Sequence, residues 1–97
     1  MALVSVSGAT TKQVALSTSY LGAGNEVQIT GGSYVELWID DAAIAFTLSF
    51  TVPGQNTIET KQITAGDSWN FHKSQGTVLL VDAKSASGTP KLNVQVM

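Results

Sequence analysis

The sequence predicts an all-β protein, an antiparallel β-sandwich of jelly-roll-like type with about eight short strands, in a single domain spanning residues 1–97. Large apolar residues alternate with small or polar ones at period two. Turn-forming residues punctuate these runs at intervals of roughly eight to twelve residues. No segment has a helical stripe of apolar residues. The 97 residues suffice for one domain and are too few for two ordinary ones.

The clearest strand pattern lies between residues 44 and 52. Its large apolar residues are Ile44, Phe46, Leu48, Phe50 and Val52. A strand places all of them on one face, whereas a helix would scatter them around its circumference. The segment Tyr34–Ile39 also alternates, and Asp40-Asp41 between the two segments is a turn signal. We therefore predict a hairpin over Tyr34–Val52, followed by a turn at Pro53-Gly54-Gln55-Asn56.

Weaker alternation between turn residues predicts the remaining strands. They are expected at Leu3–Val6, Gln13–Thr18, Glu26–Thr30, Thr57–Ile63, Ser68–His72, Thr77–Asp82 and Lys91–Val96. The continuous apolar run Val78–Val81 indicates a central strand that is covered on both sides. Leu92, Val94 and Val96 alternate with polar residues, so the C-terminal strand is expected to have one wet face.

Composition and charge argue against several function classes. Only 12% of residues are charged, the net charge is −2, and the five cations are all lysines spread along the chain. Nucleic-acid binding needs clustered cations and favours arginine forks, so we expect none, and a polybasic membrane patch is equally unsupported. Without cysteine, no disulfide or thiolate metal site is possible. The N-terminal segment lacks the pattern of a secretory signal peptide, which predicts a soluble intracellular product made without a signal of its own.

His72 is the single histidine, so any histidine-based catalysis must use it. Asp67, Ser68 and Ser74 are close in sequence, but a nucleophile needs a base oriented by a third group, and no nucleophile-elbow motif is present. A zinc site would need carboxylates alone or sharing between subunits. We interpret His72 as a strand-end residue on a polar or interface face. We expect no catalytic residues, no metal, no cofactor and no enzymatic activity.

The carboxylates are better explained as structural or solvated groups. Asp40 and Asp41 could ligate calcium, but the spacing of a calcium loop is absent and a turn explains them. Glu36 and Glu59 could serve as a glycosidase pair only if the fold brought them to the required separation. Isolated carboxylates on strand faces are usually solvated.

Tyr34 and Trp38 lie on the strand face opposite Val35, Leu37 and Ile39, so a two-layer sandwich would direct them outward. Exposed aromatics can anchor a protein interface or stack on sugar rings. The alternative is that a second layer or a long loop covers them. We favour a protein interface, because the surrounding small residues allow close packing. The candidate interface or ligand contacts are Tyr34, Trp38, Trp69 and His72.

Three segments of the C-terminal half share a pattern of strands and turns. In residues 63–71 and 76–81, Gly66-Asp67-Ser68-Trp69 forms a Gly-x-x-aromatic turn leading into paired strands. In residues 87–94, Ser87-Gly88-Thr89 precedes the last strand. These segments lie within residues 63–94, about a third of the chain, and resemble small β-sandwich accessory proteins of phage virions, of the head-decoration or head-fibre type.

The resemblance implies a non-enzymatic structural or accessory protein of the virion. Such a protein would form a homo-oligomer, with a trimer favoured, and dock onto a larger viral shell or tail protein. No catalytic residue of the family is carried over. The rival hypothesis is a carbohydrate-binding module that uses Tyr34, Trp38 or Trp69 to stack on a glycan. An enzyme assembled across subunits receives little weight.

Overall fold

The computed structural model describes residues 4–7, 10–22, 24–52, 57–73 and 76–97, which form nine strands and no helix. The strands are β1 (Val4–Ser7), β2 (Thr10–Ala15), β3 (Val27–Thr30), β4 (Tyr34–Ile39), β5 (Phe46–Thr51), β6 (Thr57–Ile63), β7 (Trp69–His72), β8 (Leu79–Ser85) and β9 (Lys91–Val96).

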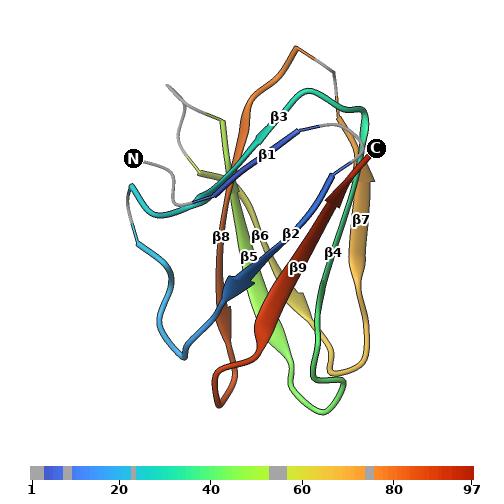
Figure 1. Ribbon diagram of the computed structural model, residues 1–97. Helices are drawn as coiled ribbons and strands as arrows, with labels where there is room; N and C mark the ends of the chain where they lie inside the picture. The colour runs from blue at the N-terminus through green and yellow to red at the C-terminus, as the bar shows by residue number, and fades with distance from the viewer. Residues whose placement is uncertain (1–3, 8–9, 23, 53–56, 74–75) are drawn as a thin grey trace.

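The strands form two sheets packed face to face, as Figure 1 shows. One has five strands in the order β1-β3-β8-β5-β6 and the other four in the order β2-β9-β4-β7. The pairs β2·β9, β3·β8, β4·β7 and β5·β6 are all antiparallel. This nested pairing across two sheets is jelly-roll connectivity, so the predicted fold class is confirmed. β1 adds to β3 in parallel at one edge.

Alternation within the strands builds the core between the sheets. β4, β5 and β8 each bury every second residue. The largest fully buried side chains are Ile29, Leu37, Leu48, Leu92, Val27, Val35, Val81, Val94 and Val96. They come from both sheets and from both halves of the chain, because the nested pairing places early strands beside late ones. Burial of this apolar surface is the main stabilising contribution to the fold.

The predicted strands agree with the structure within a few residues, but the hairpin over Tyr34–Val52 is wrong. β4 pairs with β7 and β9, whereas β5 pairs with β6 and β8 in the other sheet. The connection at Asp40-Asp41 therefore crosses between sheets. Both strands bury their alternate residues in the same core from opposite sides, which explains why their apolar patterns look matched. The turn predicted at residues 53–56 lies outside the described residues.

Two burial predictions hold in part. β8 is the central strand of its sheet, with Leu79 and Val81 buried, but Val78 and Leu80 are only half-buried. On β9, Leu92, Val94 and Val96 face the core as expected, yet Asn93 on the other face is also buried. The wet face predicted for β9 is thus partly covered by neighbouring side chains.

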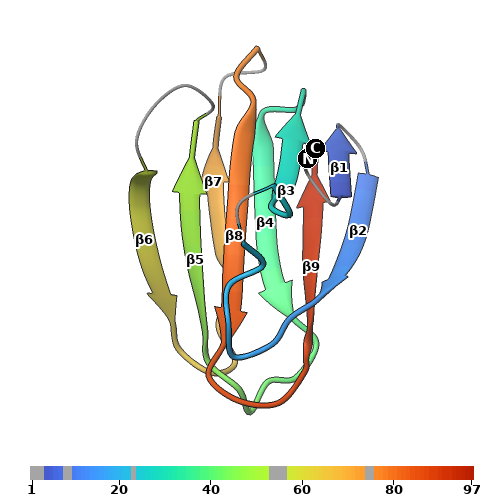
Figure 2. The ribbon, with the colours of Figure 1, turned by 90° about the vertical axis from the view of Figure 1, so that its left-hand side faces the viewer.

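The segment between β2 and β3 covers part of the outer face of the five-stranded sheet. Figure 2 shows this segment passing in front of β8. The Asp82 carboxylate of β8 accepts hydrogen bonds from the main-chain N–H groups of Leu21 at 2.6 Å and Gly22 at 3.2 Å. The ammonium of Lys84 lies 4.9 Å from the ring centroid of Tyr20. These contacts attach the segment to the sheet.

Candidate functional site

The outer face of the four-stranded sheet carries three of the four predicted contact residues. We call it the amide face and define it by the outward side chains of β2, β9, β4 and β7, which are Thr11, Gln13, Ala15, Lys91, Asn93, Gln95, Tyr34, Glu36, Trp38, Asn70 and His72. Of these, Glu36 is the one carboxylate and Lys91, at the first position of β9, the one lysine. The face is thus polar and carries one negative and one positive side chain.

A hydrogen-bonded row crosses the middle of the amide face. Asn93 is paired in register with Gln13 on one side and with Trp38 on the other. The Gln13 side chain donates from Nε2 to Oδ1 of Asn93 at 2.8 Å. Asn93 is 6% exposed despite its outward position. A buried amide must be hydrogen-bonded to avoid a desolvation cost, so this bond fixes the geometry of the Gln13 and Asn93 side chains.

Tyr34 and His72 form an aromatic pair at one end of the amide face. They are opposite each other in the β4·β7 ladder, and their ring centroids are 5.1 Å apart with a 58° angle between the planes. Tyr34 is half-buried, and His72 is exposed at the last position of β7. The structure therefore places His72 at a strand end on a polar face, beside one of the predicted anchors.

Trp38 lies toward the other end of the amide face and is half-buried. It lines a hollow of about 380 Å³ together with Glu36, Asp67, Ser68 and residues of the β4–β5 connection. The indole thus stands beside carboxylate and hydroxyl groups at the surface. An aromatic ring next to a few polar groups is a typical recognition arrangement.

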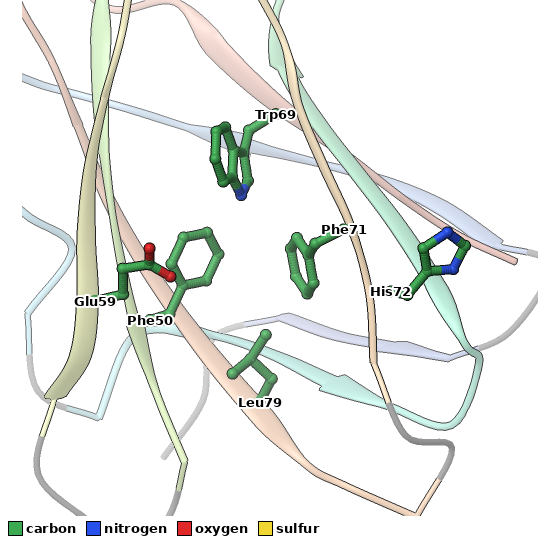
Figure 3. Close-up of a pocket in the computed structure, with 6 residues that line it drawn as sticks. All are labelled: Phe50, Glu59, Trp69, Phe71, His72 and Leu79. Carbon is green, nitrogen blue, oxygen red and sulfur yellow. The ribbon is translucent and has the colours of Figure 1, made fainter.

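Trp69 does not belong to the amide face. Leu37 is its register partner, so its side chain points toward the interior of the sandwich. It lines an apolar cavity of about 240 Å³ between β6 and β7, with Phe50, Phe71 and Leu79. Figure 3 shows Trp69 and Phe71 on one side of β7 and His72 on the other. The four predicted contacts therefore divide between two surfaces.

One charged side chain, Glu59, lines the cavity, and two lysines lie near it. The ammonium of Lys61 lies 4.9 Å from the Trp69 ring centroid and forms an ion pair with Glu59. Lys73 donates from Nζ to the carbonyl oxygen of Thr77 at 2.8 Å, and burial lowers the pKa of this ammonium. The apolar walls are completed by the edge-to-face pair of Phe50 and Phe71, whose ring centroids are 5.3 Å apart.

Phe71 is the cavity residue that the sequence interpretation missed. The alternation signal was present, because Trp69 and Phe71 share one face of β7 while Asn70 and His72 share the other. The same alternation places Trp69 and His72 on opposite faces of β7, so the two residues could have been assigned to different surfaces from the sequence. Asn93 and Gln13 carried no such signal, since their pairing depends on strands that are distant in sequence.

The carboxylates considered as ligands have structural partners. Asp40 accepts a hydrogen bond from the Lys91 main-chain N–H at 2.9 Å, and Asp41 accepts one from the Ala43 N–H at 2.9 Å. Glu36 lies on the four-stranded sheet and Glu59 on the edge of the other sheet, where its partner is Lys61. Within the described residues, no group of three or more His, Cys, Asp or Glu side chains could hold a metal ion. That same part of the chain contains no helix long and apolar enough to span a membrane.

Two solved structures are similar to this chain. A pre-peptidase C-terminal domain of collagenase from Bacillus anthracis has a TM-score of 0.57 and 16% identity, covering 97% of this chain and 93% of that one. PliG from Aeromonas hydrophila, a periplasmic inhibitor of g-type lysozyme, has a TM-score of 0.52 and 13% identity, covering 99% and 98%. No family model and no curated protein matches.

At these identities the likeness establishes the fold alone.

Proposed function

We propose that this protein is a non-enzymatic binding component that docks onto a larger assembly through the amide face. The observation that carries the proposal is the position of Tyr34 and Trp38, half-buried on a sheet face with few charged side chains, across which no described segment is attached as the β2–β3 segment is on β8. The centres of protein interfaces are depleted in charged residues and enriched in aromatic ones. Tyrosine and tryptophan are also frequent anchors of binding energy.

The two sheet faces differ in a way that supports this choice. The outer face of the five-stranded sheet carries Asp82 and Lys84, and both are engaged by the chain's own segment between β2 and β3. The amide face has its polar groups arranged by the Gln13–Asn93 bond and its aromatics fixed by strand pairing. A preorganised face loses less conformational entropy when a partner binds.

The assembly that we propose is a phage virion, in which the protein is a decoration or head-fibre-like accessory component. The resemblance of residues 63–94 to such proteins motivates this choice, and jelly rolls are common among viral capsid proteins. A homo-oligomer, with a trimer favoured, belongs to the same proposal. Sedimentation equilibrium tests the oligomer, and a protein that stays monomeric at high concentration contradicts it.

The docking experiment is a photo-crosslink from the amide face. A photoreactive phenylalanine analogue replaces Trp38, and the crosslinked products in purified virus particles are identified by mass spectrometry. We expect a capsid or tail protein. The matched control places the analogue at Tyr20, an exposed aromatic on the other sheet face, where we expect no crosslink. Equal crosslinking at both positions, or an absence of the protein from particles, contradicts the proposal.

Glycan binding is the second candidate, favoured by the hollow beside Trp38. There an indole ring stands next to the carboxylate of Glu36 and the hydroxyl of Ser68. Such a site can stack on the apolar face of a sugar while polar groups bind its hydroxyls. Screening on a glycan array tests it: binding that is lost in Trp38→Ala and kept in Tyr20→Ala, with both variants folded, supports a lectin-like role over docking to a viral protein.

A further inference from the structure

The outer edge of β7 presents main-chain hydrogen-bonding groups. β7 is the last strand of its sheet. The Lys73 N–H donates to the Ser33 carbonyl at 2.9 Å, so it points toward the β4 side. Antiparallel ladders alternate, which directs the groups of Phe71 and Trp69 toward β4 as well. The N–H and C=O groups of Asn70 and His72 therefore point away from the sheet.

This edge lacks two of the features that protect exposed edges, although β7 is short, with four residues. The neighbouring edge strand β6 carries the Glu59–Lys61 ion pair, and its pairing with β5 has a register shift between Phe50 and Thr51. Charges and bulges of this kind discourage pairing with another strand. β7 has the sequence Trp-Asn-Phe-His, without a lysine, arginine or carboxylate. Among the described strands, none pairs with the outer edge of β7, and this edge carries neither of the two features that protect β6.

A mainly apolar surface lies directly behind this edge. The cavity of about 240 Å³ is lined by Phe50, Trp69, Phe71 and Leu79, together with Glu59 and His72. Figure 2 shows that β6 extends beyond β7 on this side of the sandwich. A strand added to β7 would therefore face the inner side of β6, and it would give the four-stranded sheet a fifth strand opposite the existing five.

We propose that β7 and this cavity bind an extended segment of a partner protein, which adds to β7 as an antiparallel strand. Its residues opposite Trp69 and Phe71 point into the cavity, so the segment has two large apolar side chains separated by one residue. Asp67 precedes β7 and Lys73 follows it. An antiparallel segment that complements these charges has an acidic residue near its N-terminal end and a basic residue near its C-terminal end.

The overhang of β6 favours a lone segment over a second copy of this chain. Antiparallel pairing of two β7 edges keeps both five-stranded sheets on the same side of the joined sheet. The β6 strands of the two copies would then compete for the same space. This site also differs from the one proposed for docking, because it uses the main chain of β7 and the inward side chains, not Tyr34 and Trp38.

The probe is a synthetic peptide copying residues 67–73 with blocked termini. Centred on Asn70, it places its aspartate opposite Lys73, its two aromatic residues opposite Phe71 and Trp69, and its lysine opposite Asp67. Hydrogen exchange followed by NMR should show the Asn70 and His72 amides slowed by at least about tenfold in its presence. Protons of Leu79 should show contacts to the peptide's aromatic rings. A second peptide with its aspartate and lysine exchanged should protect these amides less.

Two variants make the test decisive. Asn70→Pro removes an outward N–H without removing a bond to β4, and it should abolish the protection. The double variant Asp67→Lys with Lys73→Glu should instead prefer the charge-exchanged peptide. A variant that merely failed to fold would lose binding to both peptides and would not invert the preference. Trp38→Ala is the matched control and should bind the first peptide as the unaltered protein does.

Three results overturn the proposal. The first is an absence of protection with either peptide. The second is a charge preference that does not invert in the double variant. The third is self-association that Asn70→Pro abolishes, which identifies the occupant as a second copy. Loss of docking in Trp38→Ala with peptide binding intact, or loss of peptide binding in Asn70→Pro with docking intact, separates this site from the amide face.

Discussion

Phe50 connects the two sheets through a ring contact between β5 and β7. It projects from β5 into the core with 5% of its surface exposed. Its ring meets the ring of Phe71, on β7 of the other sheet, at a centroid distance of 5.3 Å and an interplanar angle of 76°. Edge-to-face pairs of this kind contribute about 0.5–1.5 kcal/mol beyond their burial. The two rings therefore fill space in the core and also make a specific contact between the two sheets.

A double-mutant cycle on Phe50 and Phe71 measures this link. We expect Phe50→Ala to lower the free energy of unfolding by about 3–5 kcal/mol, as a buried phenylalanine does. The coupling with Phe71→Ala should be about 0.5–1.5 kcal/mol, measured by urea denaturation. The control cycle pairs Phe71 with Phe46, four residues earlier on β5, and should give additive effects within about 0.5 kcal/mol. Equal coupling in both cycles contradicts a direct ring contact.

At the scale of elements, one carboxylate provides several of the hydrogen bonds that attach the segment between β2 and β3. Asp82 accepts hydrogen bonds from the N–H groups of Leu21, Gly22 and Ala83 at 2.6, 3.2 and 2.8 Å. A carboxylate that accepts several main-chain hydrogen bonds stabilises the fold more than a neutral acceptor does, because these bonds are charge-assisted. Leu21 then packs against the core. This attachment is what distinguishes the covered sheet face from the amide face.

Replacing that carboxylate should release the segment. We expect Asp82→Ala to lower the free energy of unfolding by about 1–3 kcal/mol. Hydrogen exchange at the Leu21 and Gly22 amides should also accelerate, because each loses its acceptor. Ser49→Ala is the control, since Ser49 is the register partner of Asp82 on β5 and bonds none of these groups; its effect should stay within about 0.5 kcal/mol. Unchanged exchange at Leu21 in Asp82→Ala contradicts the attachment.

The strands could be predicted from the sequence because alternation is a local property. β4 and β5 each show it within a few residues, and both strands were found. Their partners could not be predicted in the same way. Asp40-Asp41 suggested a hairpin, but β4 gains more by pairing with β9, which lies far along the chain and buries Leu92 and Val94 beside Leu37. Pairing is decided by the packing of the whole core, which no short window contains.

The same distinction explains the outcome for the candidate site. The outward direction of Tyr34 and Trp38 follows from the alternation of β4 alone, and the structure agrees. That Tyr34 meets His72, and that Trp38 flanks Asn93, follows from register between distant strands. The cavity behind β7 depends on the sheets having different numbers of strands, a feature of the assembled fold.

At the scale of the whole molecule, the nested pairing makes the C-terminal strand indispensable. β9 lies between β2 and β4, and Leu92, Val94 and Val96 are fully buried. Burying each such side chain contributes about 1.5–3 kcal/mol. A domain of this size has a total stability of only about 5–15 kcal/mol. Losing β9 therefore removes a large fraction of that stability, leaves β2 without a paired strand and leaves β4 paired with β7 alone.

A chain ending at Gly88 should consequently lack a cooperative unfolding transition, as judged by circular dichroism during urea titration. A separate peptide of residues 89–97 should restore it, because β9 is continuous and pairs with both neighbours through main-chain bonds that a free peptide can form. The control peptide carries Lys in place of Val94, which buries a charge without a partner and should not restore the fold. A cooperative transition in the truncated chain alone would contradict this prediction. It would mean that the two sheets assemble without β9, so that the nested pairing is not the source of cooperativity.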